Sequence, residues 1–410
     1  MDTDNKENYK KELSFMDIVL TTIGYVIGAG IFVVISIASK YGKQFTWISV
    51  LICAVLAICT GLSFAELSSI FNKNGGEYYY VKEAFNKKFA TIVAYFIIAI
   101  EIIILNVVAF GLGNYINSIV NIPIILIAAA FLIGFGYLNY LGIRKSINYN
   151  NFTTIIEVFG LLLIILFSLT KFNTDIFDIS KFKLENIGPI LIGAGYIYFA
   201  FFGYDMVIDL SEETKDSKTT IPNAMITGIV VSTIIYILII ISAISTVGWK
   251  AISKSKSPMV DIAKAILGNK GGIIMFIIAI ISMSNTLLMS HVGASRFIQS
   301  VAEEIKLPFN INKIDKKTKT PKNAIIVITL ISLLCLIFGN LENVLSIGNI
   351  GMIILFLIIN ICVISLRLKK PHINRPFKIK GSLYNIPISS IIGVLGSVLL
   401  IIYLIKSKIF

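Results

Sequence analysis

Glycines interrupt the first long apolar segment of the chain. Gly24, Gly28 and Gly30 lie in the run from Gly24 to Phe32, which reads Gly-Tyr-Val-Ile-Gly-Ala-Gly-Ile-Phe. A helix that breaks inside hydrocarbon leaves peptide N–H and C=O groups without partners, which is tolerated only where that backbone is buried in protein or lines a watery cavity. The spacing favours a site where main-chain groups bind a ligand. Close helix packing on Gly24 and Gly28 explains the same glycines equally well.

A second apolar segment carries the same kind of interruption. Between Tyr196 and Asp209 the chain holds Gly203, flanking aromatic residues and the acid Asp205. Interrupted helices at corresponding positions of two halves are typical of transporters built from inverted repeats, which hold substrate near the middle of the membrane. The pair of segments therefore indicates a carrier.

Acidic side chains lie at membrane depth in three apolar segments, at Glu101, Glu157 and Asp205, without a lysine beside them. Such groups are costly there and usually pair, line water or take part in transport. A carboxylate without a fixed cation holds a proton, binds a metal cation or receives a cationic substrate. Glu157 with hydroxyls such as Ser282 or Ser284 is a candidate site for H⁺ or Na⁺. The alternative is a neutral Glu157 that only bonds a neighbouring helix.

Other charged residues are expected to play structural parts. Arg296 lies near the end of an apolar segment, and we expect its side chain to reach toward the membrane surface. His291 is expected to be a hydrogen-bonded structural residue, and Glu212 and Glu213 to lie in a solvated loop with salt bridges. The four cysteines lie in apolar segments without metal-ligand spacing, so no metal site is predicted.

The composition is that of a polytopic membrane protein. Of 410 residues, 56% are hydrophobic and 14% charged, and the mean hydropathy is +0.86. Runs of about 20 apolar residues, the length that crosses a bilayer, recur along the chain. They predict eleven spans, near 15–37, 45–70, 89–117, 122–141, 152–170, 187–210, 222–248, 271–298, 323–339, 343–366 and 384–405.

The positive charges predict the orientation. Lys and Arg are more numerous in the segments that share a side with the N-terminus, so residues 1–14 are expected to be cytoplasmic. The net charge of +13 lies mostly beside membrane ends, where anionic lipid head groups attract it. The expected partners are therefore the lipid bilayer and a small solute, and nucleic acid is excluded.

Several sequence blocks resemble the amino acid, polyamine and organocation (APC) superfamily of permeases. The resemblance runs along most of the chain, and its specificity comes from the order and spacing of the blocks. They are Gly28-Ala29-Gly30-Ile31-Phe32, Phe64-Ala65-Glu66-Leu67, Gly75-Gly76-Glu77-Tyr78, Phe201-Phe202-Gly203-Tyr204-Asp205, Glu212-Glu213, Ile221-Pro222-Asn223-Ala224, Gly293-Ala294-Ser295-Arg296 and Thr320-Pro321-Lys322-Asn323-Ala324.

The resemblance implies an all-α fold with a 5+5 inverted-repeat core of ten transmembrane helices, in which the first and sixth are discontinuous. Residues 15–170 would form the first repeat, 187–366 the second, and 384–405 an additional helix. First-span N–H groups would face a substrate carboxylate, and sixth-span carbonyls its ammonium group. The implied binding residues are Ile27, Gly28, Ala29, Gly30, Ile31, Phe199, Ala200, Phe201, Phe202 and Gly203.

The three phenylalanines of that set are expected to wall the ligand, although at least one is expected to be an ordinary core or lipid-facing residue. Glu101 falls on the span that lines the side-chain pocket in the resembled family and would select a cationic substrate. Several members carry a lysine where this chain has Glu157, so their coupling does not transfer directly. Asp205 stands where the family often has an acid, which favours a gating or proton-linked role.

The sequence thus predicts a secondary active transporter for amino acids in the plasma membrane, working by alternating access. H⁺ is the expected coupling ion, with Na⁺ as the second choice, and no cofactor is expected. The alternatives are an exchanger of cationic amino acids or polyamines, and a transport-dead amino acid sensor. An enzyme is not expected, because no segment gathers residues at nucleophile-and-base or metal-ligand spacing.

Overall fold

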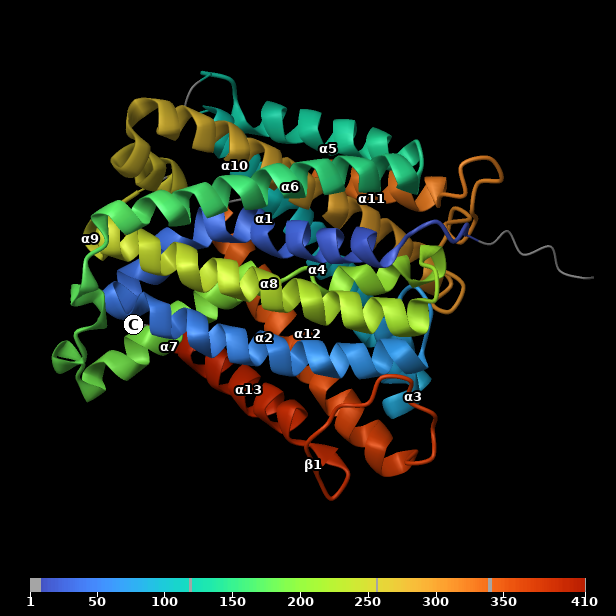
Figure 1. The fold of residues 1–410 in the computed structure, drawn as a ribbon. Helices are drawn as coiled ribbons and strands as arrows, with labels where there is room; N and C mark the ends of the chain where they lie inside the picture. Colours follow the sequence, from blue (N-terminus) through green and yellow to red (C-terminus); the bar gives the residue numbers. More distant parts are fainter. Residues whose placement is uncertain (1–8, 118–119, 256, 338–340, 410) are drawn as a thin grey trace, which may run out of the picture.

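A computed structural model describes residues 9–117, 120–255, 257–337 and 341–409, without the side chains of residues 29, 33, 341–346 and 408–409. Long helices run side by side through the molecule (Figure 1). They are α1 (Phe15–Gly42), α2 (Thr46–Ile70), α3 (Gly76–Ala84), α4 (Lys87–Asn117), α5 (Ile124–Tyr140), α6 (Ile143–Ser168), α7 (Ile187–Tyr198), α8 (Ser217–Thr246), α9 (Trp249–Ile252), α10 (Pro258–Val301), α11 (Lys322–Leu336), α12 (Leu341–Lys369) and α13 (Ile388–Ile409).

Short elements complete the chain. Antiparallel strands β1 (Ser382–Leu383) and β2 (Ile386–Pro387) form a small hairpin, the one pairing of strands in the described residues, beside the otherwise helical fold. The remaining elements are 3₁₀ helices: η1 (Lys43–Phe45), η2 (Leu169–Lys171), η3 (Thr174–Phe177), η4 (Ile179–Lys181), η5 (Leu184–Asn186), η6 (Phe199–Phe201) and η7 (Asp205–Glu213).

The helices have the length and polarity that a bilayer requires. Within the described residues, nine helical stretches are long and apolar enough to cross a membrane, and the shorter apolar helices α5 and α11 accompany them. Together these stretches occupy the regions of the spans that the sequence predicts. The fold is all-helical and polytopic, as predicted.

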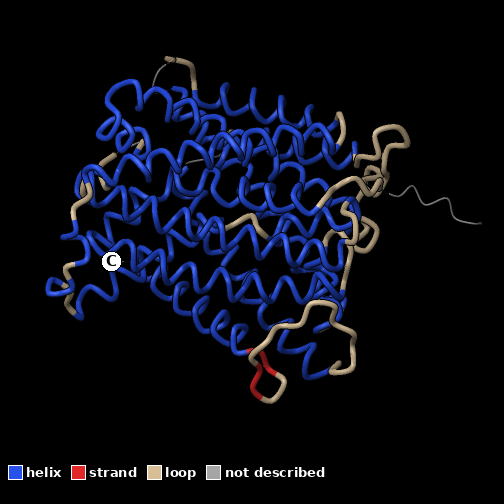
Figure 2. The backbone as a smooth tube through the Cα atoms, in the orientation of Figure 1, coloured by secondary structure: helices blue, strands red, loops and turns tan. Residues whose placement is uncertain are grey.

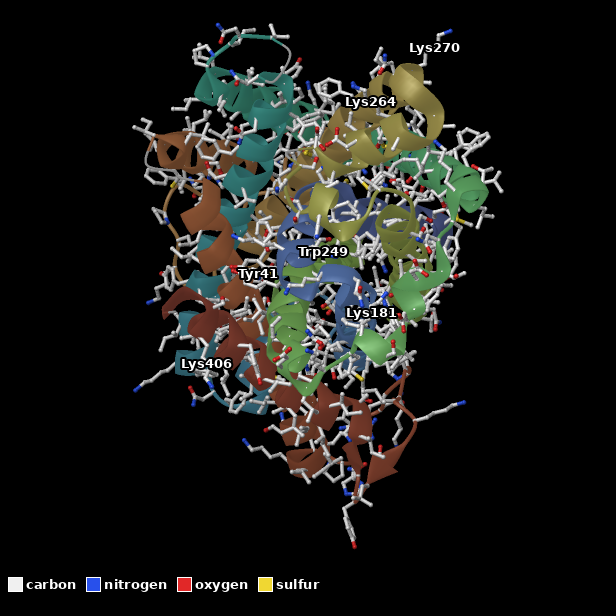
Figure 3. The ribbon with its side chains drawn as sticks, turned by 90° about the vertical axis from the view of Figure 1, so that its left-hand side faces the viewer. Tyr41, Lys181, Trp249, Lys264, Lys270 and Lys406 are labelled. Carbon is white, nitrogen blue, oxygen red and sulfur yellow. The ribbon has the colours of Figure 1, made fainter. Side chains whose placement is uncertain are left out.

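The two ends of the described chain lie at opposite ends of the helix bundle (Figure 1). The end at which α1 begins is called the N-terminal face below, and the other end the far face. On the far face the side chains of Lys270 and Lys406 extend away from the bundle (Figure 3). Charged lysines at this end, beyond the apolar middle, suit a membrane surface.

Helix α1 lies in the interior, packed against α6, α7, α8 and α10. A reciprocal cap fixes its start: the Ser14 hydroxyl accepts from the Asp17 N–H, and the Asp17 carboxylate accepts from the Ser14 N–H at 2.9 Å. The same carboxylate accepts from Asn151 of α6 at 2.7 Å. A capping box satisfies helix-end donors that would otherwise lack partners, so the entry of α1 is held rigidly at the N-terminal face.

Helix α13 lies at the edge of the bundle, against α2, α7 and α12. A buried polar network fixes it there: the Ser63 hydroxyl lies 2.9 Å from that of Ser390 and donates to Asn360 Oδ1 at 2.8 Å. Asn360 in turn donates to the Thr60 hydroxyl at 3.0 Å. These hydrogen bonds join α13 to α2 and α2 to α12, and so hold α13 in place.

Candidate functional site

The first discontinuity lies in α1. Gly28 has φ −32° and ψ −131°, so the helical hydrogen-bond pattern is interrupted there. The residues before and after Gly28 are helical, which leaves two half-helices in one membrane-length segment. The glycine-rich pattern of the sequence predicted a break at this point, and the backbone has one.

The second discontinuity follows α7. After η6 the chain becomes extended at Phe202 (φ −68°, ψ 157°), and Gly203 has φ +102° before η7 begins. This break shows as loop backbone inside the bundle in Figure 2. A residue with a Cβ is strained at such a φ, so Gly203 is required by the local conformation.

The glycines also allow close contact between the two broken segments and their neighbours. A Cβ added at Gly28 would lie 1.5 Å from Thr286 Oγ1, and one at Gly30 would lie 2.5 Å from Ala200 Cα. One at Gly203 would lie 1.7 Å from the Tyr25 ring. The packing explanation of these glycines therefore fits the structure, and the tight contacts lie beside the two discontinuities.

A buried tyrosine of α8 bridges both segments. The Tyr236 hydroxyl lies 2.5 Å from the Val26 carbonyl oxygen and 2.8 Å from that of Ala200. Both carbonyls belong to turns beside the discontinuities, and the hydroxyl has one proton to donate between them. This contact was not predicted from the sequence, because a tyrosine in an apolar span does not reveal which backbone groups it will contact.

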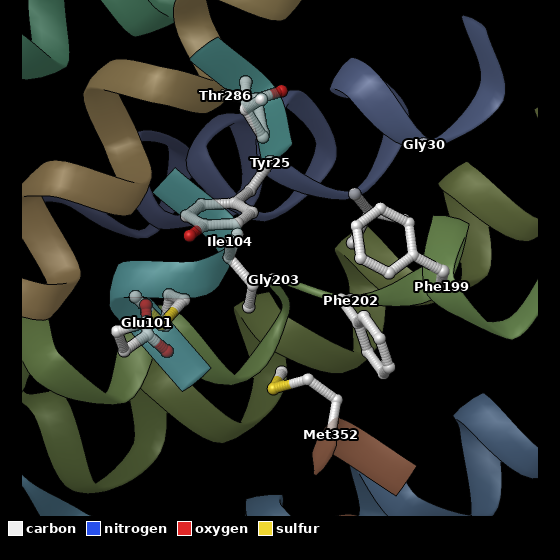
Figure 4. A pocket seen from close by; sticks show the side chains of 12 residues that line it. Tyr25, Gly30, Glu101, Ile104, Phe199, Phe202, Gly203, Thr286 and Met352 are labelled. Atoms are coloured by element: carbon white, nitrogen blue, oxygen red, sulfur yellow. The ribbon is translucent and has the colours of Figure 1, made fainter. Parts of the chain in front are cut away.

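A small cavity of about 20 Å³ lies where the two discontinuities meet α4, α10 and α12. Figure 4 shows Phe199 and Phe202 on one side of it and Tyr25 and Glu101 on another. The lining is mainly apolar, a character suited to small-molecule binding with a few polar groups for orientation. The lining residues are Tyr25, Val26, Gly30, Glu101, Ile104, Val108, Phe199, Phe202, Gly203, Met206, Thr286 and Met352.

Part of the predicted binding set lines this cavity and part does not. Gly30, Phe199, Phe202, Gly203 and Glu101 do. Five other candidates are buried in or beside the broken segments and do not line the cavity: Ile27, Gly28, Ile31, Ala200 and Phe201. The side chain of Ala29 lies outside the described part of the structure.

The three phenylalanines differ in what they face. Phe199 and Phe202 line the cavity and contact each other edge-to-face, with ring centroids 5.3 Å apart. Phe201 packs on the Tyr236 ring at 5.1 Å instead. Its hydrophobic contact stabilises the position of the tyrosine that bridges the two breaks.

Glu101 is the acidic group of the cavity. Its side chain is 3% exposed, and its Oε2 has no hydrogen-bond partner among the described residues. Asp205 lies within electrostatic range of it. The Asp205 carboxylate accepts from the Gly203 N–H at 3.2 Å and so helps hold the second break.

Glu157 is buried between α6 and α10, away from the lining of the cavity. Its Oε1 accepts a hydrogen bond from the Ser282 hydroxyl, and its Oε2 has no partner among the described residues. Ser284 does not join them: its hydroxyl lies 2.8 Å from that of Tyr149 and donates to the Ile281 carbonyl. The described residues contain no group of three or more His, Cys, Asp or Glu side chains arranged to hold a metal ion.

Comparison with known proteins assigns this arrangement to a family. The family model described as "Amino acid permease" matches residues 13–407. The chain is an amino acid permease of the APC superfamily. It is therefore a transporter and not an enzyme.

The permease has distant relatives with several substrates. It is 26% identical over 400 residues to the branched-chain amino acid permease BcaP of Bacillus subtilis (strain 168), covering 92% of this chain and 86% of that protein. It is also 26% identical to the aspartate-proton symporter of that bacterium (91% and 76% covered) and to the cystine/glutamate transporter of Homo sapiens (91% and 77%).

A solved structure shows the fold of the permease. Mhp1, described as a nucleobase-cation-symport-1 family transporter in a closed conformation with bromovinylhydantoin bound, matches with a TM-score of 0.63. The match covers 100% of this chain and 95% of that one at 13% identity, and at this identity the likeness concerns the fold alone.

At the N-terminal face of the permease, two side chains predicted to be solvated form a buried ion pair. Arg296 does not reach the membrane surface, and Glu213 is not in a solvated loop: their side chains are 0% and 1% exposed and form an ion pair at 2.5 Å. Arg296 also donates to Glu213 Oε1 at 3.1 Å and to Asn139 Oδ1 at 3.2 Å. A buried charge without a partner is strongly destabilising, so the pairing of Arg296 with Glu213 allows both to be buried.

The start of the described chain covers this ion pair. The N–H groups of Glu12 and Leu13 donate to the Glu213 carbonyl oxygen at 2.9 and 3.0 Å, and the Lys215 N–H donates to the Leu13 carbonyl oxygen at 3.0 Å. The Arg296 guanidinium carbon lies over the ring of Tyr9, 6.0 Å from the ring centroid. Residues 9–13 and the end of η7 thus form one layer over the ion pair.

Proposed function

We propose that the permease moves an amino acid with an apolar side chain across the cell membrane by alternating access, driven by H⁺. The observation that carries the proposal is that both helix discontinuities border one mainly apolar cavity. Ile104, Val108, Met206 and Met352 would contact the substrate side chain. The apolar lining favours branched or other aliphatic side chains, and the likeness to a branched-chain amino acid permease supports this choice.

The backbone of the two breaks would hold the ends of the substrate. The half-helix that follows Gly28 presents N–H groups with partial positive charge, which suit a carboxylate. The carbonyl groups of η6, at the end of α7, suit an ammonium group. Residues 15–170 and 187–366 are proposed as the two halves whose relative movement exposes this site to either side.

Glu157 is proposed as the proton carrier of transport. It is buried, it has one oxygen without a partner among the described residues, and its other oxygen contacts Ser282 of α10, a helix that packs on α1. A buried carboxyl group in such a place gains a proton when access to water allows it and loses the proton when the surroundings change. The N-terminal face is proposed as the cytoplasmic side, from the excess of Lys and Arg there.

Uptake into proteoliposomes tests the coupling. With an inward H⁺ gradient the wild type should accumulate leucine, and an Na⁺ gradient alone should not drive it. Glu157→Gln should lose accumulation and keep leucine binding. Exposed Glu303→Gln is the matched acid-to-amide control and should behave as the wild type. Equal dependence on the gradient in the wild type and Glu157→Gln would refute Glu157 as the carrier.

A second candidate substrate class is favoured by one observation. Glu101 places an acidic group with an oxygen lacking a described partner in the cavity lining, which suits a cationic side chain such as that of lysine or ornithine. Competition against labelled leucine separates the classes. If the substrate is cationic, lysine competes with leucine, and Glu101→Gln raises the inhibition constant of lysine by at least about tenfold. If it is apolar, isoleucine and valine compete and lysine does not.

A further inference from the structure

Two buried carboxyl groups lie near the contact between η7 and the start of α3, outside the cavity lining and apart from Glu157. Glu77 lies in the first turn of α3 and is 4% exposed, and Asp209 of η7 is 2% exposed. Asp209 Oδ1 accepts from the Gly75 N–H at 2.7 Å, which fixes η7 against the start of α3. A Cβ at Gly76 would lie 2.6 Å from Ile208 Cγ2, so the two segments are in direct contact.

Polar atoms of two α3 side chains lie near this contact. Among the described residues, Glu77 Oε2 and the Tyr80 hydroxyl are buried and have no hydrogen-bond partner. Tyr80 is within electrostatic range of both Glu77 and Asp209. The Glu77 oxygen can accept a hydrogen bond, and the Tyr80 hydroxyl can donate or accept one. A protonated carboxyl group provides one such donor.

The charged surroundings do not balance two anions. Arg296 is the basic residue that acts on Asp209, and its guanidinium is already engaged by Glu213. In the described residues, no Lys or Arg forms an ion pair with Glu77 or Asp209. The other titratable groups that act on the pair are Asp205 of η7, Glu101 of α4, Tyr25 of α1, Tyr80 of α3 and Tyr9 of the first residues.

We propose that Glu77 and Asp209 together bind one proton while the N-terminal face is closed, and release it to water when η7 moves away from α3. Two buried carboxylates within electrostatic range repel each other, so one of them would keep its proton in the closed state. Separation hydrates both groups, and the proton passes to solvent.

This site rests on the proposed alternation of access, and it is distinct from Glu157. It makes opening of the N-terminal face depend on pH there. If opening releases one proton, the equilibrium constant for opening increases as the pH rises. The increase is at most tenfold for each pH unit, within the range between the pKa of the pair in the open state and its pKa in the closed state. Acidification then keeps this face closed, and alkalinisation favours opening.

A cysteine placed in η7 tests the proposal. Ser211 is 1% exposed at the N-terminal face, so Ser211→Cys should react with a hydrophilic maleimide only when η7 moves. Labelling is measured in lipid nanodiscs from pH 5.5 to 7.5 for the reporter protein and for the reporter with Glu77→Gln. Dividing one labelling rate by the other removes the effect of the cysteine thiol's own pKa, which is common to both proteins. Labelling of the native cysteines is measured in protein that retains Ser211 and is subtracted.

The labelling rate of the reporter protein should rise relative to that of the Glu77→Gln protein, by up to tenfold for each pH unit. Asp209→Asn should behave as Glu77→Gln does, and Glu303→Gln should follow the reporter protein. A constant ratio across the pH range, in both amide variants, overturns the proposal. If one variant fails to fold, the other decides.

The same comparison in a Glu157→Gln background separates this site from the transport proposal. The pH-dependent ratio should persist there even if H⁺ gradients fail to drive uptake. Loss of the ratio in that background would show that Glu157 is the titrating group and would contradict a separate site.

Discussion

At the residue scale, Gly203 gives the clearest test of the broken helix. Gly203→Ala places a Cβ at φ +102° and against the Tyr25 ring, which costs at least about 1–3 kcal/mol of stability. The site should distort, and the dissociation constant for leucine should rise by at least about tenfold. Thermal unfolding and substrate binding of purified protein measure the two effects.

Gly134→Ala is the control for that substitution. Nothing lies within 4 Å of a Cβ added at Gly134 in α5, and alanine favours a helix, so stability and affinity should stay unchanged. Unchanged binding in Gly203→Ala would mean that the second break does not shape the substrate site.

The residues that the sequence could and could not identify differ in a physical way. The breaks at Gly28 and Gly203 could be anticipated because glycine clusters or aromatic and acidic neighbours accompany the glycine in those two apolar spans. Tyr236 and Met352 were not, since a side chain in an apolar span does not disclose the helix face on which it lies. The positions of Arg296 and Glu213 were predicted wrongly, because their partnership joins residues far apart in the sequence, and only folding brings them together.

At the element scale, the ion pair that joins η7 to α10 should be costly to break. Glu213→Gln leaves the Arg296 charge buried without its partner, which typically costs about 3–5 kcal/mol. We expect a lower unfolding temperature in detergent. Exposed Glu303→Gln should change stability by no more than about 0.5 kcal/mol, and an equal effect of the two substitutions would contradict a structural role for the pair.

The loop between α10 and α11 should respond to acid in a defined direction. The backbone N–H and the hydroxyl of Thr318 donate to Asp315 and lower its pKa to about 2. A lowered pKa means that the carboxylate stabilises the loop above its ordinary pKa of 3.8. This stabilisation is lost as the pH falls from about 4 to about 2.

Hydrogen exchange measures this response. Protection of the Lys317 and Thr318 amides should be constant above pH 5 after correction for intrinsic exchange, and should decline toward pH 2. Asp315→Asn should show reduced protection already at pH 7 and no decline. Full protection in Asp315→Asn would show that the charge of Asp315 does not order the loop.

The extents of the elements were also only partly predictable. Hydrophobic length located the spans, and the long helices lie where it placed them. It did not foresee that α10 continues back to Pro258 across a bend at Gly268, or that residues 169–186 form short 3₁₀ turns. Local backbone geometry outside the membrane is decided by turns and hydrogen bonds, which the hydropathy of the chain does not record.

At the scale of the whole molecule, the proposed alternation of access requires the N-terminal face to open. Leu13 and Thr214 are buried neighbours in a parallel backbone bridge that ties the start of the chain to the end of η7. Residues paired in this way are at a suitable distance for a disulfide bond. A Leu13→Cys, Thr214→Cys double variant should therefore be locked closed by oxidation.

Counterflow of labelled leucine in proteoliposomes tests this lock. Oxidation should reduce exchange in the double variant to below about a tenth of its reduced value, because a covalent bond far exceeds the few kcal/mol that separate conformational states. Reduction should restore it. Each single-cysteine variant keeps the native cysteines and should be insensitive to oxidant. Full exchange by the oxidised double variant, with the disulfide verified by mass, would mean that the first residues stay bound to η7 throughout the cycle, and that the N-terminal face opens elsewhere.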